Sequence, residues 1–379
     1  MTPRALEGVR VLDLSQYLPG PYAAQILADL GAQVVKVEPP AGDPMARLGP
    51  IDGDGVSAFY KLVNGGKTVV PMDLKTAPGR AAFESLVARA DALVESFRPG
   101  ALERLGLGAA RLRALNPRLV HCALSGFGQT GPYARRAGHD VTYMALGGGL
   151  ATSGDVARPG IAHPPTADFA GGMQAALCVL AGLLRRAGDG RGATIDVSLM
   201  ETVLAWQPTT LTGALRPGHA PARGAVLLNG GAACYRVYET GDGRFVALGA
   251  LEAKFWAAFC RAVGRDGWIP RHDEPMPQEA LIGEVAALFA GARLAAWVAR
   301  LEGVDCCFQP VLDPAQVPDH PHVAARGLVH RVEGADPRVE VSFPALFDGA
   351  PPAPRPRVRQ GTFDEVARAW GAEMTTRQR

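Results

Sequence analysis

Neither charge dominates this 379-residue sequence, which has 39 Lys and Arg residues against 37 Asp and Glu. It also lacks a basic tail and an acidic block. Surfaces dedicated to nucleic acid or to anionic membranes are usually strongly basic. The sequence therefore does not favour either class of partner, although a local basic pocket for a small anionic ligand is still open.

Long hydrophobic runs are also absent. Residues 1–7 contain Arg4 but no apolar stretch of the kind found in signal peptides. The longest apolar stretch, Met173–Leu184, is shorter than the roughly 20 residues that span a bilayer. We therefore expect a cytoplasmic protein without a membrane segment.

The cysteines and histidines do not form recognisable metal motifs. None of the six cysteines belongs to a Cys-x-x-Cys pair, and in a large chain without a secretion signal we expect buried free thiols. His320-Pro321-His322 lacks helical ligand spacing and nearby cysteines, so a polar loop is the expectation there. The sequence predicts no metal and no permanently bound cofactor.

The common nucleotide and esterase motifs are missing. There is no GxxxxGK[ST] phosphate loop and no GxSxG nucleophile elbow. Residues 126–131 read Gly-x-Gly-x-x-Gly, but Pro132 and a loop-like segment follow where a dinucleotide site needs a helix. A glycine-rich turn after the fifth strand is the prediction.

Strand and helix patterns alternate through the first 130 residues, with 46 glycines and 31 prolines in the chain to form the turns between them. Buried strands are expected at 9–14, 33–37, 68–74, 92–97 and 118–125. Because helical segments lie between them, the pattern predicts a parallel sheet in a doubly wound α/β domain.

The rest of the chain divides into a loop, a long helix and a second region. Residues 131–165 are predicted as loop, and Asp168 opens a helix to about residue 186 that is apolar nearly all round and should be buried. An Asp242-Gly243 hairpin and helical patterns after it predict a smaller α/β domain.

The predicted domains have three parts. We expect a large Rossmann-like domain at 1–212, a small α/β domain at 226–325, and a C-terminal segment at 326–379 that returns to the large domain.

A series of short motifs follows one another in a fixed order. They are Leu18-Pro19-Gly20-Pro21, Val35-Lys36-Val37-Glu38-Pro39, Asn64-Gly65-Gly66-Lys67, Met72-Asp73-Leu74-Lys75, Glu95-Ser96-Phe97-Arg98-Pro99-Gly100, Glu103-Arg104-Leu105-Gly106, Ser125-Gly126-Phe127-Gly128, Gly138-His139-Asp140 and Ala167-Asp168-Phe169-Ala170-Gly171-Gly172. In order and spacing the series resembles the family III CoA-transferase and 2-methylacyl-CoA racemase superfamily, over nearly the whole chain and most strongly over 8–205. The resemblance implies a CoA-binding large domain, an interlocked homodimer, and an acyl-CoA thioester as substrate, with coenzyme A entering as part of it.

Two residues distinguish the branches of that superfamily. Its transferases use the Asp that opens the long helix as a nucleophile, which here is Asp168, and its racemases add the His of a Gly-His-Asp motif, which here is His139. The resemblance therefore favours a racemase that epimerises the α-carbon of 2-methyl-branched acyl-CoA thioesters. Such inversion needs one group to remove a proton and another to deliver one on the opposite face, so His139 and Asp168 would share a proton. The enolate also needs hydrogen-bond donors, for which the glycine-rich loops offer backbone N–H groups.

Alternatives to this hypothesis stay open. The first alternative is a CoA-transferase that moves CoA between carboxylic acids through an acyl-enzyme at Asp168. The second is a non-catalytic relative that binds acyl-CoA. Without the family resemblance, the sequence around Asp168 indicates an ordinary helix N-cap, and His139 would be an ordinary loop histidine. Asp140 has three readings: it orients His139, contacts CoA, or holds a turn.

The resemblance also implies further site residues. Glu252 matches a small-domain glutamate that racemases place near the catalytic His, and a solvated carboxylate at a helix start is its alternative. Residues that match the family's CoA-binding positions are Lys36, Asn64, Lys67, Phe97, Arg98 and Arg104. Pro39-Pro40 stand where the family often has Arg, so the contact to the CoA 3′-phosphate would fall to Lys36.

Overall fold

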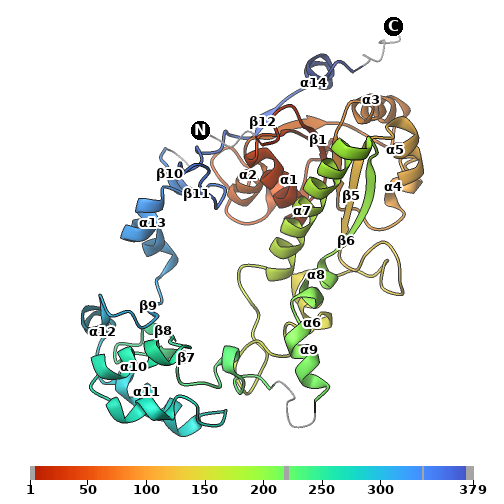
Figure 1. The fold of residues 1–379 in the computed structure, drawn as a ribbon. Coiled ribbons are helices and arrows are strands. Elements are labelled where there is room, and N and C mark those ends of the chain that lie inside the picture. Colours follow the sequence, from red (N-terminus) through yellow and green to blue (C-terminus); the bar gives the residue numbers. More distant parts are fainter. Residues whose placement is uncertain (1–4, 217–221, 335–336, 373–379) are drawn as a thin grey trace. The chain divides into compact units, whose positions relative to one another are not determined.

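The fold is described from a computed structural model, which describes residues 5–216, 222–334 and 337–372. The chain forms two compact units (Figure 1). The large unit comprises residues 1–147, 163–206 and 319–379, and the small unit comprises 148–162 and 207–318. The predicted division at residues 212 and 226 differs from this one, because residues 148–162 and the helix that follows residue 207 join the small unit.

A seven-stranded parallel sheet forms the centre of the large unit, in the order β12-β3-β2-β1-β4-β5-β6. The strands are β1 (Arg10–Leu14), β2 (Gln33–Glu38), β3 (Thr68–Pro71), β4 (Ala92–Glu95), β5 (Val120–Ser125), β6 (Ala193–Ser198) and β12 (Arg359–Gln360). Their Val- and Leu-rich sequences suit strands covered on both faces. The predicted doubly wound α/β fold is confirmed, and the strand order reverses between β1 and β4.

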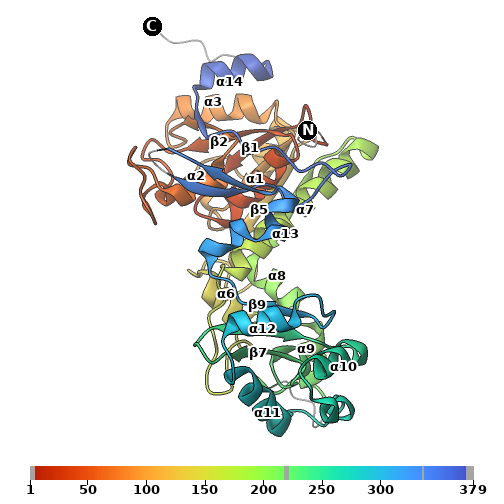
Figure 2. The same ribbon diagram turned by 90° about the vertical axis from the view of Figure 1, so that its left-hand side faces the viewer.

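Helices cover both faces of this sheet (Figure 2). On one face α3 (Ala77–Val87), α5 (Ala109–Leu115) and α14 (Phe363–Trp370) bury apolar side chains against the strands. On the other, α1 (Pro19–Asp29) packs along α7 (Thr166–Asp189). Shorter helices of the unit are α2 (Ala58–Asn64), α4 (Ala101–Arg104), α6 (Asp140–Leu146), α8 (Leu199–Ala205), α13 (Pro321–Arg326) and the 3₁₀ turn η1 (Pro44–Arg47).

The long helix α7 is not buried all round, contrary to the sequence prediction. Its small residues face α1, where a Cβ on Gly172 would lie 2.6 Å from the Pro19 carbonyl oxygen. On the opposite side Met173, Leu177 and Leu184 are 56%, 59% and 78% exposed. Among the described residues α7 is the one single helix long and apolar enough to cross a membrane, and half of that apolar stretch is packed inside the unit, as in a core helix.

The small unit contains a three-stranded antiparallel sheet of β7 (Tyr235–Glu239), β8 (Phe245–Gly249) and β9 (Phe308–Pro310). Gly243, at φ +71°, makes the predicted hairpin turn. Helices α9 (Pro208–Ala214), α10 (Ala253–Ala262), α11 (Glu279–Ala290) and α12 (Leu294–Leu301) accompany the sheet, with the 3₁₀ turns η2 (Leu227–Asn229), η3 (Asp266–Arg271) and η4 (Pro314–Asp319). An aromatic core of Trp256, Phe259, Phe289 and Trp297 holds the unit together.

The C-terminal segment joins the large unit through specific contacts. β12 pairs with β3, and the Arg355 guanidinium donates to both carboxylate oxygens of Asp29 at 2.7 and 2.6 Å. Within this segment β10 (Val329–Val332) pairs antiparallel with β11 (Arg338–Val341).

The cysteines are all free, as expected. Four are buried, but Cys307 is exposed and Cys178 half-buried, so the expectation that all six are buried is wrong for these two.

Candidate active site

A cavity of about 460 Å³, here called the strand-end cavity, lies at the carboxyl ends of the strands of the large unit. The residues that matter for its chemistry are Gln16, Phe97, Arg98, Ser125, Arg136, His139, Tyr143 and Asp168. A smaller slot of about 140 Å³, here called the side slot, shares Gln16 and Phe97 with it. Open α/β sheets bind ligands at this edge, beside the point where the strand order reverses.

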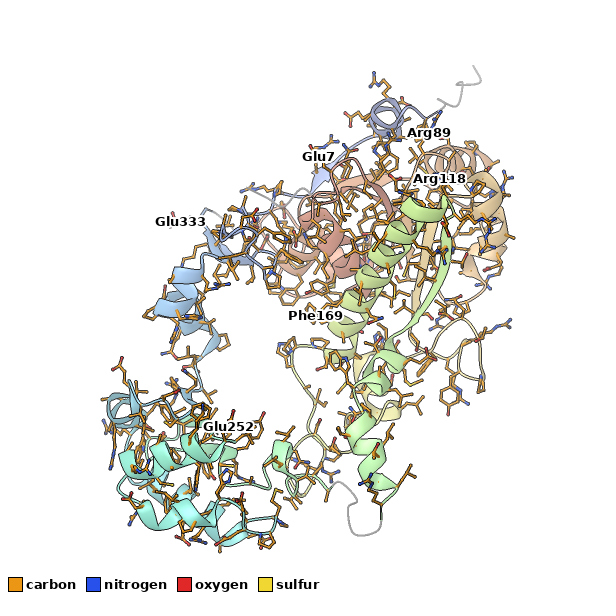
Figure 3. All side chains as sticks on the ribbon, viewed as in Figure 1. Glu7, Arg89, Arg118, Phe169, Glu252 and Glu333 are labelled. Atoms are coloured by element: carbon orange, nitrogen blue, oxygen red, sulfur yellow. The ribbon has the colours of Figure 1, made fainter. Side chains whose placement is uncertain are left out.

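Asp168 lies in the first turn of α7, two residues after the helix begins at Thr166. Figure 3 labels its neighbour Phe169 near this end of the helix. Asp168 is not the N-cap, because Asp140 caps the helix: one of its carboxylate oxygens accepts the N–H groups of Ala167 at 2.6 Å and Asp168 at 3.2 Å. The Asp168 carboxyl is thereby left to line the strand-end cavity.

The environment of Asp168 favours its protonated form. Burial, and then the negative charge of Asp140, raise the pKa of Asp168 from 3.8 to about 7. A helix N-terminus would favour the ionised form, so desolvation outweighs the helix dipole here. Asp168 can therefore both hold and release a proton near neutral pH.

His139 lies at the N-cap of α6, a helix that falls inside the stretch predicted as loop. The Thr142 hydroxyl accepts the His139 N–H at 3.0 Å and donates to the His139 carbonyl at 2.7 Å. These bonds fix the backbone, while the exposed imidazole has no hydrogen-bond partner among the described residues. His139 and Asp168 thus line one cavity, reached from two different helices.

Tyr143 is a cavity residue that the sequence analysis missed. Its ring fills the space left by two glycines: a Cβ on either Gly126 or Gly138 would lie 2.5 Å from the Tyr143 ring. Phe127 packs edge-on against it, with ring centroids 5.2 Å apart. The glycine-rich turn after β5 therefore makes room for the Tyr143 ring. In the sequence, only these glycines could have indicated it.

Several Arg and Lys side chains beside the strand-end cavity and the side slot have no ion-pair partner among the described residues. Arg98 and Arg136 line the strand-end cavity, and the Arg136 guanidinium stacks over the Tyr133 ring at 4.1 Å. Lys75, exposed and not predicted, lines the side slot together with Phe97 and Leu105. Arg104 is exposed on α4, next to Leu105.

Three predicted CoA contacts are contradicted by burial. Lys36 and Asn64 are 0% exposed and Lys67 is 1% exposed. The Lys67 ammonium donates to Asp13 at 2.9 Å, to the Pro21 carbonyl at 2.7 Å and to Asn64 at 2.9 Å. These side chains hold the interior of the large unit, and the Lys67 ammonium has all three of its N–H groups committed there.

The Lys36 ammonium is committed in the same way. It donates to the Ser15 carbonyl at 2.6 Å and pairs with Asp43 at 3.0 Å. Lys36 thus binds the turn between β1 and α1, whereas Lys67 binds the elements on either side of it, through Asp13 of β1 and Pro21 of α1. Gln16 and Tyr17 of that turn line the strand-end cavity. Their influence on the site is through the backbone.

Glu252 belongs to the small unit, where it is exposed at the N-cap of α10 (Figure 3). Its side chain caps no helix N–H.

The segment at His320, predicted as a polar loop, caps α13, where the His320 ring accepts the His322 N–H at 3.3 Å. No group of three or more potential metal ligands occurs within residues 5–216, 222–334 and 337–372.

An Asp140→Asn substitution separates charge from capping. Asn keeps the oxygen that accepts the two N–H groups of α7 but removes the negative charge, so we expect the pKa of Asp168 to fall below 7 but to stay above 3.8, because burial is the larger cause. Carboxyl ¹³C NMR titration measures it. The control is Asp189→Asn at the other end of α7, where Asp189 accepts the Arg191 N–H. An unchanged pKa in Asp140→Asn would show that the Asp140 charge does not act on Asp168.

The doubly wound fold places a carboxyl with a raised pKa and an imidazole in one cavity at the strand ends, an arrangement suited to acid–base chemistry. Residues 6–359 match CoA-transferase family III, and the chain belongs to that family. Its superfamily comprises CoA-transferases and acyl-CoA racemases.

Known relatives come from both branches. The chain is 36% identical over 332 residues to the α-methylacyl-CoA racemase of Homo sapiens, covering 85% of this chain and 82% of the relative. It is 38% identical over 271 residues to the succinyl-CoA–D-citramalate CoA-transferase of Chloroflexus aurantiacus, covering 69% and 66%. A CaiB/BaiF family protein of Brucella suis has the same fold, with TM-score 0.82, 28% identity, and coverage of 96% and 98%.

Proposed function

We propose that this enzyme epimerises the α-carbon of 2-methyl-branched acyl-CoA thioesters by two-base proton transfer between His139 and Asp168. The observation that carries the proposal is that a free imidazole and a carboxyl poised near neutrality line the same cavity. The racemases among its relatives, of which the human enzyme is 36% identical, support the same reaction.

The proposed step conserves protons. One group removes the α-proton, the electron pair of the C–H bond moves into the thioester to form an enolate, and the other group delivers its own proton to the opposite face of the carbon. The two groups then hold the opposite protonation states, and catalysis in the reverse direction restores them. A carboxyl with a pKa of about 7 is present in both forms at neutral pH, as this reversal requires.

The cations and the apolar slot fit the rest of the substrate. We assign the adenine to the side slot, against Phe97 and Leu105, and the phosphates to Lys75, Arg98 and Arg136. Because Lys36 is buried, Lys75 takes the 3′-phosphate in this proposal. The junction of the side slot with the strand-end cavity, at Gln16 and Phe97, gives the pantetheine arm a route into that cavity. The roles of Glu252, of Arg104 and of an interlocked dimer stay predictions.

A CoA-transferase is the second candidate, favoured by the 38% identity to the Chloroflexus aurantiacus enzyme. Asp168 would then attack the acyl-CoA carbonyl as a nucleophile. The raised pKa of Asp168 argues against this, because protonation at neutral pH removes the nucleophilic form from part of the protein.

His139→Ala distinguishes the two candidates. We expect α-proton exchange to fall by about 10²–10⁴-fold, because a positioned acid or base supplies a factor of this size. His322→Ala, on exposed α13, is the control and should exchange at the wild-type rate. Hydroxylamine trapping followed by mass spectrometry reports acylation at Asp168. Acid-dependent acylation of Asp168 that survives His139→Ala would establish the transferase instead.

A further inference from the structure

The Tyr143 side chain packs into a space that two glycines leave open for it. The side chain is 7% exposed, and its ring lies against Gly126 and Gly138, where a Cβ on either would lie 2.5 Å from the same ring carbon, Cε1. A Cβ on Gly126 would lie 2.5 Å from the phenolic oxygen itself, so any other residue there would displace the hydroxyl. Two separate turns therefore carry glycine where the Tyr143 ring packs, and Gly126 also leaves room for the hydroxyl.

The Tyr143 hydroxyl has no hydrogen-bond partner among the described residues, although a buried tyrosine usually has one. The oxygen is not sealed from solvent, since it is absent from the fully enclosed polar atoms, and Tyr143 lines the strand-end cavity. The free hydroxyl thus faces space in which a ligand can lie.

The groups that surround this hydroxyl are those of the site. Burial comes first and the Asp168 charge second in raising the pKa of Tyr143 to about 12; Asp140 adds to the effect and Arg98 opposes it. The phenol therefore keeps its proton at neutral pH and is a hydrogen-bond donor. His139 lies one helical turn earlier, where its carbonyl accepts the Tyr143 N–H at 3.2 Å.

We propose that the Tyr143 hydroxyl donates a hydrogen bond to the thioester oxygen of the substrate and stabilises the enolate. This inference rests on the proposed racemase function. As the base removes the α-proton, the electron pair moves into the Cα–C bond and negative charge grows on the thioester oxygen. Tyr143 keeps its proton and strengthens its hydrogen bond to that oxygen; the electron pair returns to Cα when the opposite acid delivers its proton.

Tyr143 is a side-chain donor in addition to the backbone donors expected from the sequence. From the sequence we expected backbone N–H groups of the glycine-rich loops as donors to the enolate. The Gly126 carbonyl accepts the Met200 N–H at 3.1 Å and the Ser198 hydroxyl at 3.3 Å, which anchors the turn. The anchored glycine leaves room for a side-chain donor in the cavity.

Tyr143→Phe tests the assignment, because it keeps the packed ring and removes only the hydroxyl. We expect kcat for α-proton exchange to fall by about 10²–10³-fold, the usual effect of removing an enolate or oxyanion donor. KM should change less than about threefold, because the bond strengthens as charge develops. Binding of the unreacted thioester, measured by calorimetry in an Asp168→Asn background, should be unaffected.

Tyr22→Phe is the matched control, since Tyr22 lies outside the strand-end cavity and packs against Phe169. It should exchange at the wild-type rate. A wild-type kcat in Tyr143→Phe, or a loss confined to KM, would overturn this inference while leaving the racemase proposal in place. Absence of exchange in the wild-type protein would overturn the racemase proposal, and this inference with it.

Discussion

Asp168→Asn should abolish α-proton exchange, by about 10³-fold or more, and should also stabilise the fold at alkaline pH. The first effect follows because an amide neither accepts nor delivers the proton. The second follows from the pKa of about 7 in the folded protein against 3.8 for the ordinary carboxyl. Loss of activity with a gain of stability is typical of residues selected for chemistry rather than for packing.

The pH dependence of the stability gain has a definite sign. Below pH 3.8 Asp168 is protonated in both the folded and the unfolded protein, so its raised pKa has no effect. As pH rises to 7 the unfolded state ionises and the folded state resists, so wild-type stability falls until both are charged. Above pH 7 the penalty is on the order of 4 kcal/mol, and Asn removes it.

Urea unfolding at pH 5 and pH 8.5 measures this difference. The advantage of Asp168→Asn over the wild type should grow between the two pH values. Asp189→Asn, at the far end of α7, should show no such growth. An advantage of equal size at both pH values would contradict the raised pKa.

Lys67→Met should destabilise the large unit by about 3–5 kcal/mol, because it leaves a buried carboxylate without its cation. The Lys67 and Asp13 side chains are both fully buried, with 2.9 Å between their charged atoms. Burial opposes the charge on Asp13, but the Lys67 and Lys36 charges prevail and lower the pKa of Asp13 to about 2. Removing Lys67 takes away the larger of the two lysine charges that offset this burial, so the Asp13 carboxyl must either stay charged without its nearest cation or take up a proton on folding, and both cost stability.

Chemical denaturation of Lys67→Met, with Lys75→Met as control, tests this assignment. Lys75 is exposed and its ammonium has no partner among the described residues, so its loss should change stability by less than about 0.5 kcal/mol. Adding Asp13→Leu to Lys67→Met should recover part of the loss, because an apolar pair needs no compensation. If Lys67→Met and Lys75→Met were equally stable, the structural role of Lys67 would be contradicted and a CoA contact would again be the better interpretation.

The sequence predicted the central sheet well because its strands carry continuous Val and Leu runs, and a parallel arrangement follows from the helices between them. It missed α6 for the opposite reason. That helix has only seven residues and lies in a glycine-rich stretch. The Thr142 hydroxyl bonds the His139 backbone at its start, and the Tyr143 ring packs against Gly126 and Gly138. Neither contact is visible in a local pattern.

The site residues show a similar division. The motifs placed His139 and Asp168 in the chain, and the fold brings both to one cavity. The same motifs led to Lys36, Asn64 and Lys67, because a motif gives the position of a lysine and not the direction of its side chain. The Lys36 ammonium is bound by the turn after β1 and the Lys67 ammonium by β1 and α1 on either side of it, and only the tertiary structure shows this.

The central claim is that His139 and Asp168 exchange a proton across the α-carbon of a bound thioester, and incubation of each pure 2-methylacyl-CoA epimer in D₂O tests it most directly. We predict that both epimers reach the same mixture, with one deuterium at the α-carbon and no added carboxylic acid, as read by NMR and mass spectrometry. An α-carbon that keeps its proton and configuration, while CoA passes to an added acid, would contradict the account.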